Sequence, residues 1–187
     1  MKKISKILGI VGIILLLTGC SCGKMDAKDR VQEFLDQYRN LSANVLGDLD
    51  NVVDQETDLT EEQKEQYRDI MKKQYSDLNY EIVDEQYDGD TAVVEAKITV
   101  YDLYKTQKDA TIYLNEHSDE FNDESGNYDS RKFMDYKLDK MQKNNDTVEY
   151  TITFNLSKNE DGNWQITELS QSDLEKIHGI YNYDDEK

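Results

Sequence analysis

The spacing of apolar residues predicts where helices begin and end in the first part of the chain. Between Asp26 and Gly47 the apolar positions recur every three or four residues, which predicts an amphipathic helix with Asp26 as its N-cap. Thr60 and Gln63 have the spacing of a capping box and predict a second helix, with Tyr67 among the apolar residues on one side. The polar residues 48–58 are expected to connect these two helices.

Beyond Asn79 the apolar residues alternate with polar ones, which indicates strands. Residues 80–100 predict a hairpin that turns at Asp88-Gly89. Residues 147–156 predict the clearest strand, and a turn at 159–162 returns the chain as a second strand at 164–169. Each predicted strand has one apolar and one polar side, so the sheet is expected to bury one face.

Helical segments are predicted between and after the two hairpins. One covers residues 103–116, another begins near Ser130, and the residues between them form a polar loop with five acids. Ser172 and Glu175 predict a capping box for a short last helix that ends at Gly179, and residues 181–187 are expected to fray. The fold class predicted is α+β, a curved antiparallel sheet of two hairpins packed against helices.

The first twenty residues have a different pattern. Three lysines precede an apolar run at residues 7–17, which is typical of a signal peptide, because a membrane-spanning helix needs about 20 apolar residues. An uncleaved anchor helix is the alternative. The run ends at Leu17-Thr18-Gly19-Cys20, which resembles the lipobox of bacterial lipoproteins.

The lipobox resemblance implies cleavage between Gly19 and Cys20 and attachment of lipid to Cys20. It divides the chain into a signal peptide at 1–19, a lipidated tether at 20–26, a domain at 27–181 and an acidic tail at 182–187. The protein would then lie on the extracytoplasmic face of the cell membrane, held there by its acyl chains. Cys22 would have no cysteine partner in the mature chain, so we expect no disulfide.

Charge restricts the partners of the mature chain. Removal of residues 1–19 leaves 19 of the 22 basic residues against 40 acidic ones, a net charge of −21. Like-charge repulsion excludes nucleic acid and disfavours contact with anionic lipid headgroups. A basic protein partner and loosely held cations remain compatible with this charge, and so does an acidic surface that serves only solubility.

The hairpin sequences carry a second resemblance. The phrase from Tyr80 to Asp88-Gly89-Asp90-Thr91-Ala92-Val93-Val94, together with Gly162-Asn163-Trp164-Gln165-Ile166, is similar to the NTF2-like (cystatin-like) domains of bacterial lipoproteins. The resemblance implies a sheet that wraps a long helix as a cone with a pocket, over residues 27–181. The family also includes enzymes that pair Tyr with Asp in the cone, although a fold alone does not confer an activity.

Two functions therefore remain open: a non-catalytic binding module for an envelope protein or small ligand, which we favour, and a small enzyme with a Tyr/Asp acid–base pair. No catalytic motif is recognised, and we expect no cofactor. The polar side of the strands is the candidate binding face, and an ordinary solvated face is the alternative. Its residues are Lys97, Thr99, Tyr101, Glu149, Thr151 and Thr153, with Glu95 and Asn155 beside them.

Two stretches approach the spacing of a calcium-binding EF-hand loop: one begins at Asp84 and ends at Glu95, the other runs from Ser157 to Glu168. Because both lie between predicted strands instead of helices, we expect no metal site. The two histidines stand outside any motif. His117 is expected to be solvated, and His178 is expected to be a cation that suits the C-terminal end of the last helix.

Overall fold

The computed structural model describes residues 25–186 and contains a four-stranded antiparallel sheet with the order β1-β2-β3-β4. The strands are β1 Asn79–Asp88, β2 Thr91–Tyr101, β3 Thr147–Lys158 and β4 Trp164–Glu168. The helices are α1 Ala27–Arg39, α2 Ala43–Asp54, α3 Glu61–Ser76, α4 Leu103–Glu116, α5 Ser130–Lys143 and α6 Gln171–Ile177, with the short 3-10 helices η1 Ser118–Phe121 and η2 Tyr183–Glu186. The α+β class predicted from the alternation of segments is confirmed.

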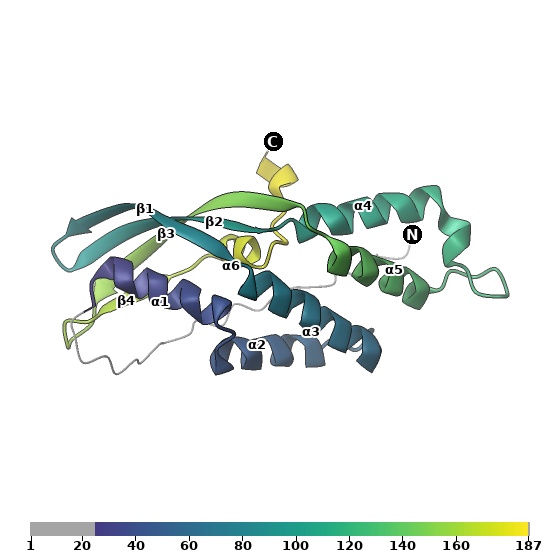
Figure 1. Ribbon diagram of the computed structural model, residues 1–187, viewed down its shortest axis with the longest axis horizontal. Coiled ribbons are helices and arrows are strands. Elements are labelled where there is room, and N and C mark those ends of the chain that lie inside the picture. Colours follow the sequence, from purple (N-terminus) through teal and green to yellow (C-terminus); the bar gives the residue numbers. More distant parts are fainter. Residues whose placement is uncertain (1–24, 187) are drawn as a thin grey trace.

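The sheet buries the face that the sequence marks as apolar. Val94 lies opposite Phe154 and Ala96 lies opposite Ile152, and all four side chains are buried. Figure 1 shows α1, α2 and α3 on the same side of the sheet. The Phe34 ring of α1 meets the Phe154 ring edge to face at 5.8 Å. The single-sided core predicted from the period-two pattern is therefore present.

The helix predicted from Asp26 to Gly47 is two helices, so that prediction is wrong in its length. Asp26 does cap α1, and its side chain accepts a hydrogen bond from the Asp29 amide at 2.7 Å. The chain leaves the helical conformation at Leu41, whose φ is +49°, and α2 begins after the N-cap Ser42. Gly47 lies inside α2. Apolar spacing continues through the break because α2 has a buried side of its own.

The two helices between the hairpins form an arm, which comprises α4, η1, the following loop and α5. α4 has the predicted bounds, and the arm extends from the sheet along the long axis of the molecule (Figure 1). A separate small core, made by Ala110, Phe121 and Phe133, holds the arm together. The segment 117–129, expected to be only a polar loop, therefore contributes Phe121 to a core and contains η1.

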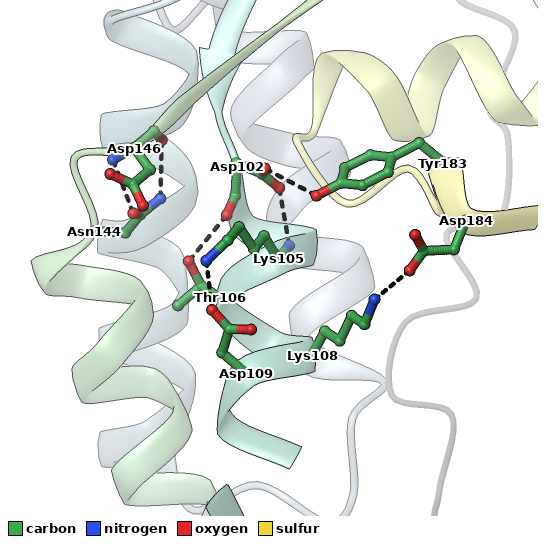
Figure 2. A network of polar contacts seen from close by, with 9 residues as sticks. All are labelled: Asp102, Lys105, Thr106, Lys108, Asp109, Asn144, Asp146, Tyr183 and Asp184. Carbon is green, nitrogen blue, oxygen red and sulfur yellow. Dashed lines mark hydrogen bonds and ion pairs between the residues drawn. The ribbon is translucent and has the colours of Figure 1, made fainter. Parts of the chain in front are cut away.

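The C-terminal segment differs from the prediction in two details. The N-cap of α6 is Ser170, whose hydroxyl accepts a hydrogen bond from the Asp173 amide at 3.1 Å, and not Ser172. The tail was expected to fray, but its described part forms η2 and contacts the base of the arm through Tyr183 and Asp184. Figure 2 shows the Tyr183 hydroxyl directed at Asp102, to which it donates a hydrogen bond at 3.1 Å, and Asp184 beside Lys108.

Candidate functional site

The outer face of the sheet, opposite α1–α3, brings the predicted binding residues together. Lys97 lies opposite Thr151 and Thr99 lies opposite Glu149 in the antiparallel register of β2 and β3. Tyr101 occupies the last position of β2, opposite Thr147. The side chains on this face alternate with the buried ones along both strands, so the predicted residues fall at the outward positions, although Tyr101, at the end of β2, also contacts the C-terminal end of α3.

Charged groups on this face are partly paired. The Lys97 ammonium lies 2.8 Å from a Glu149 carboxylate oxygen. The Tyr101 hydroxyl donates a hydrogen bond to Asp77 at 2.8 Å, and this bond, with a smaller contribution from burial, raises the pKa of Tyr101. The Lys73 ammonium lies 4.3 Å from the centre of the Tyr101 ring. This end of the face therefore consists of hydrogen-bonded and ion-paired groups.

The sequence analysis missed a pair of acids on the same face. The register of β1 and β2 shifts between Ile82 and Asp84, which places Asp84 directly opposite Glu95, while Glu95 lies opposite Thr153 on β3. A β-bulge of this kind inserts one residue, here Val83, and changes which side chains face outward after it. No proline or glycine marks the bulge in the sequence, so the alternation of apolar and polar residues could not reveal this shift.

A shallow crevice separates the arm from the α2–α3 helices. Its lining residues are Glu56, Leu59, Tyr67, Gln107, Met134, Lys137, Leu138 and Met141. The enclosed volume is about 10 Å³, which is room for roughly one water molecule. Burial lowers the pKa of Lys137, while the charge of Glu56 acts in the opposite direction. The crevice is thus a packing gap in which a lysine stem lies against apolar side chains.

Tyrosine–aspartate pairs exist in the domain, but they lie away from this crevice. The Tyr80 hydroxyl donates a hydrogen bond to Asp36 at 2.8 Å, and burial together with that carboxylate raises the pKa of Tyr80 to about 12. The other pairs are the Tyr101–Asp77 bond on the sheet face and two bonds at the base of the arm, Tyr183–Asp102 and Tyr104–Asp184. These bonds connect one secondary-structure element to another, which is a structural role.

The histidines occupy different environments. The His117 ring stacks on Tyr113 with centroids 4.1 Å apart, and its Nδ1 lies 3.3 Å from Glu120 on the exposed side of the arm. His178 is 6% exposed and its Nδ1 lies 2.8 Å from the Tyr75 hydroxyl. Burial lowers the pKa of His178 to about 4, so the expected cation at the end of α6 is wrong: a buried imidazole is neutral at pH 7.

The EF-hand-like spacings fall on hairpins. Asp84 and Glu95, which would be the first and last calcium ligands, are cross-strand neighbours in the ladder of β1 and β2. Within residues 25–186, no group of three or more His, Cys, Asp or Glu side chains is arranged to hold a metal ion. The lipobox with Gly19 and Cys20 lies outside the described residues. No helix in the described part is long and apolar enough to cross a membrane.

Comparisons with known proteins leave the family open. No known protein family matches the sequence, and no curated protein matches it either. A crystal structure of the Bacillus subtilis subsp. subtilis str. 168 protein YcdA, which is provisionally described as a lipoprotein, aligns with a TM-score of 0.40 and 14% identity over 84% of this chain. The alignment covers 48% of YcdA, so this chain spans about half the length of that protein.

Proposed function

We propose that the protein is a lipid-anchored, non-catalytic binding module on the extracytoplasmic face of a bacterial cell membrane, with an NTF2-like domain. The observation that carries the binding function is the outer sheet face, where polar side chains of β1, β2 and β3 lie in register on the side away from the main helical layer, with α3 in contact only at the Tyr101 end among the described helices α1–α3. The anchor rests on Leu17-Thr18-Gly19-Cys20 and the charged and apolar segments before it.

The anchor is tested by the Cys20→Ala variant of the full chain. Loss of the sulfur removes the site of lipid attachment, so we expect no acylation and no processing before residue 20. The measurements are metabolic labelling with a fatty-acid analogue, the mass of the mature protein, and fractionation of membranes. A Cys22→Ala variant is the matched control and should be acylated normally. Acylation and correct processing of Cys20→Ala would refute the lipoprotein assignment.

The binding face is tested by a charge and size change at two exposed threonines of β3, Thr151→Arg with Thr153→Arg. Both side chains are exposed, so the variant should fold, which circular dichroism and thermal unfolding can confirm. A control with the same charge change places Ser125→Arg and Gln171→Arg away from this face. We expect capture of envelope components by the wild type and the control, and loss of that capture in the face variant. Equal capture by all three would show that the face is only solvated surface.

The enzyme alternative receives less support from the geometry. The crevice admits about one water molecule, and the Tyr–Asp pairs of the domain are directed at neighbouring secondary-structure elements. An acid–base pair acts on a substrate only when both groups reach the reacting atoms. We therefore place the function on the exposed face of the sheet and not in this crevice.

A further inference from the structure

The outer sheet face contains an arrangement of charges that costs stability. Asp84 and Glu95 lie directly opposite each other on β1 and β2, and like charges at such positions destabilise a sheet. Neither carboxylate has an ion pair within residues 25–186, although Asp84 accepts a hydrogen bond from Gln86 at 2.9 Å. The nearby cation Lys97 is held by Glu149. The pair is therefore left without a neutralising group.

Exposed apolar side chains flank these acids. Val93, on the outer face of β2 beside Glu95, is 36% exposed, and Val83 at the bulge of β1 is 48% exposed. Among the strands of residues 25–186, β1 pairs with β2 alone, so it is an edge strand of this sheet. Figure 1 shows α1–α3 on the opposite side of the sheet, and the side chains of Val83, Asp84 and Val93 are exposed. Apolar groups next to charges can contribute affinity while the charges select the partner.

We propose that this part of the face, defined by Asp84, Glu95, Val83 and Val93, binds an extended segment of another protein that is rich in lysine and arginine. The proposal rests on the binding function proposed above and names its partner chemistry. A cation placed between Asp84 and Glu95 relieves their repulsion, whereas an anionic ligand meets additional repulsion from both.

The geometry of an extended segment suits this arrangement. Alternate side chains of an extended chain are about 7 Å apart, and neighbouring strands are about 4.8 Å apart. Because Asp84 and Glu95 lie opposite each other on neighbouring strands, one basic side chain of such a segment can contact both acids, and the next one on the same side lies beyond them.

The test uses the full-length protein in detergent and a fluorescent peptide of Lys-Thr repeats, with a peptide of Glu-Thr repeats as the negative probe. The face variant is Asp84→Asn with Glu95→Gln. The control is Glu62→Gln with Glu65→Gln, which removes two exposed acids of α3 and changes the net charge equally. We expect the face variant to weaken binding of the Lys-Thr peptide about tenfold, and the control about twofold or less, in fluorescence anisotropy at physiological salt.

Thermal unfolding supplies an independent readout. Because the two acids repel each other, the midpoint of unfolding of Asp84→Asn with Glu95→Gln should equal or exceed that of the wild type, so a loss of binding does not reflect misfolding. An equal effect of the face and control variants would show attraction by net charge alone and would overturn the proposal.

The outcome is also distinguishable from a failure of the proposed function. If Thr151→Arg with Thr153→Arg abolishes capture of an envelope component but the Lys-Thr peptide does not bind the wild type, the face binds a partner of another chemistry and the basic segment is refuted. If the peptide binds and competes with the captured component, both proposals are supported. If neither binds the face, both are refuted.

Discussion

Replacing Gly179 with alanine should destabilise the domain strongly, because this residue lies where three elements meet. Gly179 follows α6 with a φ of +71°, and an ideal Cβ there would lie 2.2 Å from the Tyr101 carbonyl oxygen and 2.4 Å from the Gln74 amide nitrogen. Gln74 is 1% exposed; its side-chain oxygen accepts from the Tyr101 amide at 3.0 Å, and its nitrogen donates to the Ile177 carbonyl at 3.3 Å. An added methyl group must therefore displace either β2 or this buried amide.

The magnitude follows from two contributions. A non-glycine residue in the left-handed region costs about 1–2 kcal/mol. Displacing Gln74 leaves buried polar groups without hydrogen bonds, which costs about 1–3 kcal/mol more. The expected loss is about 2–5 kcal/mol, a large share of the roughly 5–15 kcal/mol that stabilises a typical domain. Gly126 has a φ of +81° with nothing within 4 Å of its ideal Cβ, so Gly126→Ala should cost only the first contribution.

Urea unfolding followed by the fluorescence of Trp164, the single tryptophan, measures both variants. The difference between Gly179→Ala and Gly126→Ala isolates the steric contact from the backbone effect, because both positions share a positive φ. The Gly179 variant should unfold at clearly lower urea with a similar dependence on urea concentration. Equal midpoints for the two variants would show that Gly179 is not confined by Tyr101 and Gln74, and the reasoning would fail.

Three further predictions follow from the buried contacts. In urea unfolding, Ile152→Ala should lower the free energy of unfolding by about 2–5 kcal/mol, because Ile152 is 0% exposed. Thr153→Ala should change it by no more than about 0.5 kcal/mol, because Thr153 faces outward. Similar losses in the two variants would contradict the one-sided core. Tyr183→Phe removes the hydrogen bond to Asp102, which is 7% exposed, and should cost about 1–2 kcal/mol; an unchanged stability would mean that the tail does not fasten the arm. Burial lowers the pKa of His178 from 6.5 to about 4, so on acidification the unfolded chain takes up this proton at a higher pH than the folded domain does. The free energy of unfolding therefore falls as the pH decreases from 6.5 toward 4, by up to about 3 kcal/mol. Urea unfolding of the wild type and His178→Gln at several pH values should show that their difference shrinks on acidification.

Elements with local signals could be predicted from the sequence. The Thr60–Gln63 capping box is present with both of its hydrogen bonds, and the alternation over residues 147–156 marked both faces of β3 correctly. The N-cap of α6 was misassigned because Ser170 and Ser172 each precede an acid by three residues, and the position at which β4 ends decides between them. Spacing alone carries no information on that endpoint.

Other features depend on contacts that the sequence does not display. The break at Leu41 requires a left-handed backbone that a leucine seldom adopts, and the helical periodicity on either side conceals it. His178 is neutral because Tyr75 and its neighbours bury it, which the helix position alone could not indicate. The opposed acids Asp84 and Glu95 depend on the bulge at Val83. The residues on the outer side of β2 and β3 could thus be predicted from the sequence, whereas the pairing of two acids across β1 and β2 could not.

The proposed anchor and the proposed face have a consistent arrangement. Residues 20–26 span at most about 25 Å, so a lipid on Cys20 would keep the start of α1 close to the membrane. Figure 1 places that start beside β4 and the ends of the hairpins, whereas the arm extends to the other end of the molecule. The outer face runs between these two ends and is not covered by α1–α3. If both proposals hold, the basic segment would reach the face from the side of the domain. The negative net charge of the chain would attract this segment and repel anionic lipid.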